Sequence, residues 1–263
     1  MAIWEDFELD CTEYLNKQFG AYAQFIHQGG PDSTKPDIFV HTSTGNRFYI
    51  EAKHTPAQCG QFVLLPNIES GKFEYSTKND THLNSYAKMI MEYMNCEFDA
   101  FRECGTAGKE IEIQNGQEIF SNWIIEMYKQ KGVVFFITND YVILPIHKFA
   151  DYFEVTAKYR IKRSGSDAVG KTRSLEILEY IKSNSYLIDA YQIEGKKLFV
   201  ESNQNLHNLR FVYRMNEYMF SLRDNKYEVR KLSNTYHANV IFSIKAQGKK
   251  EGISDSAFIE ILK

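Results

Sequence analysis

The chain has 263 residues, of which 43% are hydrophobic and 25% are charged, with 15 Gly and five Pro. This composition is typical of a folded globular protein and excludes a disordered chain or a low-complexity linker protein. No apolar run approaches the roughly 18 to 20 residues that span a bilayer, and the acidic start MAIWEDFELD is unlike a signal peptide, so we expect a cytoplasmic protein that contacts no membrane.

The net charge of −3 is unevenly distributed along the chain. Residues 1–150 contain 12 Lys and Arg against 20 Asp and Glu, whereas residues 151–263 contain 19 against 14. This asymmetry favours a protein that binds a metal ion with its first part and a phosphate backbone with its second. Solvated surface charge without a function is the alternative. The four Cys residues form no C-x-x-C pair, so the sequence indicates neither a zinc site nor a disulfide framework.

The first part of the chain is predicted to alternate helices and strands. Residues 3–19 place apolar side chains on one stripe at helical spacing, and Gly20 ends this helix. DIFVHT and RFYIEAK are predicted to form an antiparallel hairpin across a turn at residues 43–46, followed by a strand at QFVLL.

Two helices and two strands are predicted to complete this part. The first helix covers about residues 81–93, with Asp80 or Thr81 as its N-cap. The other elements are expected at QEIFSNWIIEMYKQK (helix), VVFFIT and YVILPI (strands). This order predicts an α/β (α+β) fold in which one mixed central sheet is flanked by helices.

Residues 151–263 are predicted to form a β-rich second lobe. Only SLEILEYIKS has helical periodicity there. Strands are expected at VTAKYRIKRS, at YQIEGKKLFV with a turn near Glu194-Gly195, and at FVYRM, YMFSL, KYEVRKL and NVIFSI. We therefore expect two parts, residues 1–150 and 151–263.

The stretch KPDIFVHTSTGNRFYIEAK carries the most chemical information. Because side chains alternate along a strand, Glu51 and Lys53 share one face of the second hairpin strand, while Ile50 and Ala52 share the face that packs. The hairpin brings Asp37 close to Glu51. Two neighbouring carboxylates repel each other unless a divalent cation lies between them. A lysine beside them can orient a water molecule or stabilise charge that develops on a phosphate.

Pro36-Asp37 followed by Glu51-Ala52-Lys53 resembles the signature of the PD-(D/E)XK nuclease superfamily. The predicted order of helix, hairpin, strand and helices over roughly residues 3–146 is similar to the core of that superfamily. The resemblance implies Mg²⁺-dependent hydrolysis of phosphodiester bonds in double-stranded DNA. It implies Asp37, Glu51 and Lys53 as catalytic residues and Asp37, Glu51 and Ala52 as metal ligands. An ordinary polar strand end with an ion pair between Glu51 and Lys53 is the alternative.

The resemblance also implies further residues of an active site. The acid that this superfamily carries on its first helix matches Glu8 best, with Glu5 and Glu13 as rivals. Gln58 and Gln61 resemble glutamines that line the active site in several branches of the superfamily, although they could equally belong to a plain polar loop.

The segment KYRIKRSGSDAVGKTR is predicted to contact DNA phosphates. Its basic residues alternate on one strand face and continue into a Gly/Ser loop, from which hydroxyl groups can bond phosphate oxygens and an arginine can contact guanine. YRIKRSGS also resembles segments of type II restriction endonucleases. A basic solvated edge is the alternative. The predicted DNA-binding residues are Lys158, Arg160, Lys162, Arg163, Ser164, Ser166, Lys171, Arg173, Arg230 and Asn234.

GSDAVGKT, residues 165–172, matches the pattern of a P-loop that binds nucleoside triphosphates. A P-loop follows a buried parallel strand, yet the preceding segment carries Lys158, Arg160 and Lys162, which a buried central strand would not tolerate. The chain that follows is also short and mainly β. We therefore expect this segment to contact DNA and not a nucleotide.

Together these features predict a restriction-type endonuclease, with residues 1–150 as the nuclease core and residues 151–263 as a basic DNA-recognition lobe. A repair or junction-resolving nuclease, a non-catalytic DNA-binding protein and a P-loop NTP-binding protein are the alternatives. A homodimer is expected because one such site cuts one strand and two-fold DNA sites favour two-fold proteins. For a restriction enzyme, the resemblance implies a cognate DNA methyltransferase as partner.

Overall fold

The computed structural model describes all residues except 1–2, 30–34, 185 and 249–250. The chain divides into two compact units, Met1–Arg160 with Ala238–Lys263, and Ile161–His237. This division differs from the expected boundary at residue 150. The end of the chain returns to the first unit because strand β16 (Tyr236–Ala246) pairs there with strand β4 (Ala57–Asn67).

The first sheet of the first unit is mixed. Its strands, in spatial order, are β1 (Ala23–His27), β2 (Ile38–Thr42), β3 (Arg47–Lys53), β7 (Val133–Thr138) and β8 (Ile143–Pro145). β3 pairs with β7 in parallel, and the other neighbours are antiparallel. The hairpin and the strand at 133–138 that the sequence predicts are therefore confirmed. Strand β1 was not predicted.

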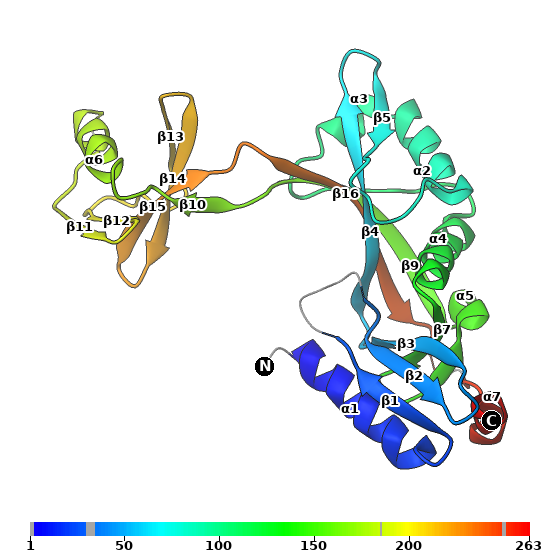
Figure 1. Cartoon of the computed structure of the whole chain (residues 1–263). Coiled ribbons are helices and arrows are strands. Elements are labelled where there is room, and N and C mark those ends of the chain that lie inside the picture. Colours follow the sequence, from blue (N-terminus) through cyan, green and yellow to red (C-terminus); the bar gives the residue numbers. More distant parts are fainter. Residues whose placement is uncertain (1–2, 30–34, 185, 249–250) are drawn as a thin grey trace. The chain divides into compact units, whose positions relative to one another are not determined.

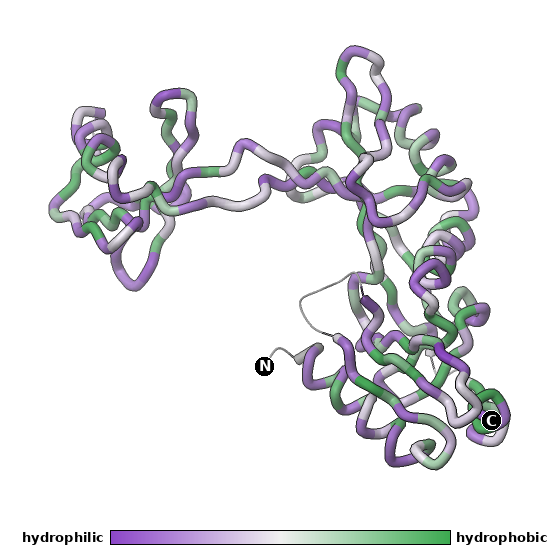
Figure 2. Tube along the Cα trace, viewed as in Figure 1, coloured by the Kyte–Doolittle hydropathy of each residue, from purple (hydrophilic) through white to green (hydrophobic). Residues whose placement is uncertain are grey.

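Helices cover both faces of this sheet (Figure 1). On one face, α1 (Ile3–Phe19) and α7 (Asp255–Leu262) pack together, with the ring centroids of Phe19 and Phe258 5.0 Å apart. Figure 2 shows hydrophobic residues along α7. On the other face lie α4 (Gly116–Gln130) and α5 (Phe149–Tyr152), where Tyr128 and Phe149 contact Phe136 of β7. This flanked mixed sheet matches the fold class that the sequence predicts.

A second sheet in the same unit corrects the expectation of one sheet. Its order is β5 (Lys72–Tyr75), β4, β16, β9 (Phe153–Arg163) and β6 (Lys109–Glu110). The strand predicted at QFVLL is part of β4, which leaves the hairpin and pairs with β5 and β16. Trp123 of α4 stacks on Phe242 of β16 with ring centroids 4.5 Å apart. Helix α4 thus packs on both sheets and fixes one against the other.

The helix predicted at about 81–93 begins later than expected. Helix α2 runs from Ser85 to Cys96 and is followed by α3 (Phe98–Arg102). Its N-cap is Asn84, whose side chain accepts a hydrogen bond from the backbone N–H of Ala87 at 2.8 Å. Asp80 and Thr81, the predicted caps, lie in the preceding loop, so that prediction was wrong. A short 3₁₀ helix, η1 (Ile146–Lys148), precedes α5.

The second unit is a sheet covered by one helix. Strands β11 (Ala190–Glu194), β12 (Lys197–Glu201), β15 (Lys226–Leu232), β14 (Asn216–Arg223) and β13 (Arg210–Tyr213) follow in this order, and β10 (Ser166–Ala168) pairs with β15. Helix α6 (Ser174–Ser183) buries Ile177, Leu178 and Ile181 against this sheet. The unit contains 13 Lys and Arg against nine Asp and Glu, so it is basic and β-rich as predicted.

Within the described ranges, none of the helices has both the length and the apolar composition required to cross a bilayer.

Candidate active site

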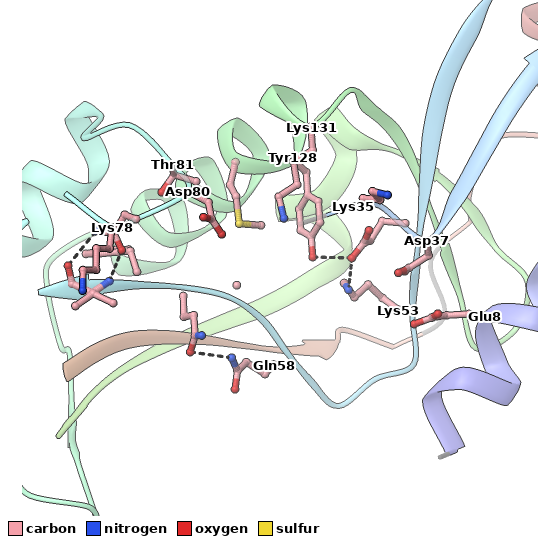
Figure 3. A pocket seen from close by; sticks show the side chains of 17 residues that line it. Glu8, Lys35, Asp37, Lys53, Gln58, Lys78, Asp80, Thr81, Tyr128 and Lys131 are labelled. Atoms are coloured by element: carbon pink, nitrogen blue, oxygen red, sulfur yellow. Dashed lines mark hydrogen bonds and ion pairs between the residues drawn. The ribbon is translucent and has the colours of Figure 1, made fainter. Parts of the chain in front are cut away.

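The first unit contains a cleft of about 420 Å³ between the first sheet, α4, β4 and the loop before α2 (Figure 3). All four residues predicted to be catalytic line this cleft, and so do both predicted glutamines. The predicted lining residues are Glu8, Asp37, Glu51, Lys53, Gln58 and Gln61. The structure therefore brings together side chains that lie more than 50 positions apart in the sequence.

The hairpin places Asp37 beside Glu51. Asp37 precedes β2, and its neighbour Ile38 pairs with Ile50 of β3, so Asp37 lies across the hairpin from Glu51. Asp37 Oδ2 accepts a hydrogen bond from the backbone N–H of Ala52 at 2.9 Å. Ile50 and Ala52 are buried in the core beneath α1, on the opposite face from Glu51. The alternation inferred from the sequence is thus present in the structure.

Two donors converge on the carboxylate of Glu51. Lys53 Nζ lies 2.6 Å from Glu51 Oε1, and the hydroxyl of Tyr128 donates a hydrogen bond to the same oxygen at 2.9 Å (Figure 3). The Lys53 ammonium also lies 5.5 Å from the centre of the Tyr128 ring. Tyr128 was not predicted, because nothing in the helical sequence QEIFSNWIIEMYKQK marks this tyrosine for a site 77 positions away.

Burial and like charge perturb the acids of the cleft. Two effects raise the pKa of Asp37 to about 8: desolvation by burial, which is the larger, and repulsion from Glu51. Desolvation also raises the pKa of Glu8, against the lowering effect of His27. Burial alone would lower the pKa of Lys53, but the neighbouring charges, Glu51 foremost, raise it, so Lys53 stays protonated. Such perturbed groups in one cleft are typical of a functional site.

Glu8 alone of the three helix-one candidates lines the cleft. It is buried, and His27 Nε2 lies 3.2 Å from Glu8 Oε2. A Cβ atom on Gly29 would lie 1.9 Å from the same oxygen, so the backbone of Gly29 packs directly against this pair. Glu13 is exposed on α1, and Glu5 is not among the residues that line the cleft.

A β-bulge explains how both glutamines reach the cleft. On a regular strand Gln58 and Gln61, three residues apart, would point to opposite faces. Here the register between β4 and β16 shifts. Gln58 pairs with Ser243 and Gln61 pairs with Ile241, so β4 has one more residue between these two pairs than β16 has. Gly60, with a φ of +106°, lies inside this bulge. Gln58 Nε2 donates to Gln61 Oε1 at 3.3 Å.

The acids of the cleft fit a divalent cation in their chemistry. Carboxylate oxygens are hard ligands, and a cation would relieve the repulsion between Asp37 and Glu51, which after desolvation is the second cause of the raised pKa of Asp37. No cluster of three or more His, Cys, Asp or Glu side chains close enough to hold a metal occurs in the described part of the chain. Such a site would need the carbonyl of Ala52 and water to complete its ligands, which suits Mg²⁺.

The cleft is also lined by polar residues that the sequence does not predict as part of the site. They come from a loop before α2 and from chain segments beside the strands, and no motif marks them. These residues are Lys35, Lys78, Asn79, Asp80, Thr81 and Lys131.

None of the ten residues predicted to bind DNA lines the cleft. Lys158 and Arg160 of the first unit border another groove, of about 310 Å³, together with Gln58. Lys158 Nζ lies 2.9 Å from Glu110 Oε1. These two residues therefore lie on the sheet that also carries the bulge.

The remaining predicted DNA-binding residues belong to the second unit. Arg163 pairs with Glu217 at 2.6 Å, and Arg230 pairs with Glu228 at 2.8 Å, so both arginines are held within the unit. Arg230 Nε also donates to Ser166 Oγ at 2.8 Å. The others are exposed: Lys162, Ser164, Lys171, Arg173 and Asn234.

The segment that matches the P-loop pattern has a different structure. Its first half forms β10, which pairs antiparallel with β15, and Gly170 donates its N–H to the carbonyl of Lys196 at 2.9 Å. In the described residues of the second unit, the strand pairs β10–β15, β11–β12, β12–β15, β13–β14 and β14–β15 are all antiparallel. The parallel strand that precedes a P-loop is therefore not present among them.

No protein-family model matches the chain, and no curated protein sequence does. Among solved structures, the chain is similar to one described as HhaI endonuclease in complex with DNA. The two share 38% sequence identity, the match covers 99% of each chain, and the TM-score is 0.68.

Proposed function

The chain belongs to the HhaI endonuclease family and has a type II restriction endonuclease-like fold, and from this we propose that it hydrolyses phosphodiester bonds of double-stranded DNA at a specific sequence, with Mg²⁺ as cofactor. The convergence of Asp37, Glu51 and Lys53 in one cleft carries this proposal. The 38% sequence identity, in a match that covers 99% of each chain, supports transfer of the endonuclease activity as a whole.

The residues of the cleft have distinct roles in this proposal. Asp37 and Glu51 would hold the metal ion together with the carbonyl of Ala52, and the bound ion would supply positive charge at the phosphate and lower the pKa of a water molecule. Lys53, protonated and 2.6 Å from Glu51, donates toward the attacking water or a phosphate oxygen. Glu8 adds a further acid to the same cleft, and Gln58 and Gln61 offer amide groups to the DNA.

The two parts of the chain divide the work in this proposal. The first unit cuts, and the basic second unit binds the DNA backbone and contributes to the choice of sequence. The exposed cations Lys162, Lys171 and Arg173 are the residues of the second unit that we expect to meet phosphates. Arg163 and Arg230, which are ion-paired, must release or share their partners in order to contact DNA.

A digestion assay tests the proposed activity. Unmethylated plasmids of varied sequence are incubated with the protein and Mg²⁺, and the fragment ends are sequenced. Defined fragments from the wild type, lost in Asp37→Ala and Lys53→Ala, are expected. Lys88→Ala and Glu92→Ala on the exposed side of α2 serve as matched controls and should cut normally. No cutting with any divalent metal would overturn the proposal, and a preference for branched DNA would favour a junction-resolving enzyme.

The restriction hypothesis predicts two partners, a second copy of the chain and a cognate methyltransferase, which the geometry of the cleft does not itself require. A homodimer should convert supercoiled plasmid directly to linear DNA, whereas a single site acting alone should accumulate nicked circles. A cognate methyltransferase should abolish cutting when the plasmid is first modified by it. These two assays test the predicted partners separately from the chemistry.

A further inference from the structure

Tyr128 lies at the end of α4 with its hydroxyl directed into the cleft (Figure 3). The residue is 5% exposed, and its ring packs edge-on against Phe136 with centroids 5.2 Å apart. The hydroxyl donates to Glu51 Oε1 at 2.9 Å, and Lys53 Nζ lies 2.6 Å from the same oxygen. Both donors therefore bond to Oε1 of the carboxylate. The other oxygen, Oε2, is left for a cation that binds Glu51.

Other buried tyrosines of this unit satisfy their hydroxyl groups differently. Tyr159 donates to the backbone carbonyl of Leu64 at 2.9 Å, and the hydroxyl of Tyr152 lies 3.2 Å from Thr138 Oγ1. Burial of a tyrosine requires some partner for its hydroxyl, and a neutral group suffices. Tyr128 instead bonds a carboxylate that lines the cleft, which burial alone does not require.

We propose that Tyr128 is a positioning residue that fixes the orientation of the Glu51 carboxylate, so that Glu51 meets a divalent cation through Oε2 while Oε1 stays bonded to Tyr128 and Lys53. Hydrogen bonds to a ligating carboxylate orient it and tune its affinity for the metal. Helix α4 thereby couples its packing on both sheets to the geometry of the cleft. The inference rests on the proposed function in one respect, namely that Glu51 is a metal ligand.

The test compares Tyr128→Phe with Tyr152→Phe. Each change removes one buried hydroxyl and keeps the ring, and both residues are 5% exposed. Three quantities are measured for the full chain: the dissociation constant for Mn²⁺ by calorimetry without DNA, the single-turnover cleavage rate as a function of Mg²⁺ concentration, and DNA affinity with Ca²⁺ in place of Mg²⁺. Thermal unfolding shows whether each variant is folded.

Tyr128→Phe should weaken Mn²⁺ binding about 10-fold and shift the Mg²⁺ dependence of cleavage to higher concentration, as is usual when a partner of a metal ligand is removed. DNA affinity should stay as in the wild type, and Tyr152→Phe should change neither quantity. Unchanged Mn²⁺ affinity in Tyr128→Phe, an equal loss in Tyr152→Phe, or a wild type that binds no Mn²⁺ would overturn the inference. Weakened Mn²⁺ binding without any DNA cleavage by the wild type would support the inference while sinking the nuclease proposal.

Discussion

The backbone N–H of Ala52 donates a hydrogen bond to Asp37 Oδ2 at 2.9 Å, which ties the residue before the first hairpin strand to the strand that carries Glu51 and Lys53. Asp37 is consequently held in a buried position beside a second carboxylate. The hydrogen bond lowers its pKa, but desolvation and the charge of Glu51 raise it by more. The hairpin therefore holds two carboxyl groups, those of Asp37 and Glu51, close together at the cleft, where their charges repel each other.

This arrangement predicts how stability depends on pH in the metal-free protein. The pKa of Asp37 rises from about 3.8 to about 8 on folding, so its contribution to stability is fully present below about pH 4 and is lost as the pH rises through about 8. The free energy of unfolding of the wild type should fall over this window relative to that of Asp37→Asn, whose residue 37 does not titrate. Urea unfolding in EDTA at several pH values measures both. Parallel pH profiles would contradict the prediction.

Glu8→Gln should lower the cleavage rate by about 10-fold or more, since it removes an acid that lies in the cleft beside the catalytic set. Glu13→Gln, an exposed change on the same helix, is the matched control and should cleave at the wild-type rate. Single-turnover rates at saturating Mg²⁺ decide between them. Equal cleavage rates for Glu8→Gln and the wild type would show that Glu8 has no role in the reaction.

Gly60→Ala should destabilise the protein through the β-bulge. A Cβ atom there would lie 3.0 Å from Trp123 and 3.2 Å from Met127, both on α4, whereas a Cβ atom on Gly71 meets nothing within 4 Å. Both glycines have positive φ angles, +106° for Gly60 and +61° for Gly71, so Gly71→Ala controls for a Cβ atom on a residue of positive φ that has no close neighbour. Overpacking of this kind costs about 1–3 kcal/mol. The free energies of unfolding of Gly60→Ala and Gly71→Ala should differ by that amount. Similar values would show that Trp123 and Met127 move aside for the added Cβ atom at little cost.

Displacement of the bulge should also reduce cleavage by Gly60→Ala, because Gln58 and Gln61 would lose their common orientation toward the cleft. Gly71→Ala should cleave as the wild type does.

Lys171→Ala should weaken DNA binding across all sequences and reduce the salt slope by about one, as the loss of one phosphate contact does. Lys182→Ala, in the last turn of α6, is the control in the same unit. Titrations with duplex DNA at several salt concentrations give the slope. If instead Lys171→Ala left DNA affinity unchanged and abolished ATP binding, the P-loop interpretation of this segment would be correct.

The sequence predicts the hairpin and its acids because the relevant contacts are local. Asp37, Glu51 and Lys53 lie within 17 residues, so strand alternation and one turn suffice to place them together. Tyr128 could not be found this way, since it reaches Glu51 from a helix whose place is set by packing on two sheets. Such tertiary contacts leave no periodic signal in the sequence.

Long-range strand pairing accounts for several of the other errors. The second sheet was missed because β4 pairs with β16, whose residue Asn239 lies opposite Val63. The boundary at residue 150 was displaced for the same reason. The common orientation of Gln58 and Gln61 depends on the bulge, which a regular period of two cannot indicate.

The second unit begins and ends at neighbouring positions, because it lies between β9 and β16, which are adjacent strands of one sheet. Ser164 donates its N–H to the carbonyl of Thr235, and Ser233 donates to Gly165, so the entering and leaving segments run side by side. A chain without this insert would need only a short hairpin connection between β9 and β16 to keep the sheets and helices of the first unit. A single insertion or deletion at this connection would therefore add or remove the basic second unit and leave the cleft of the first unit intact.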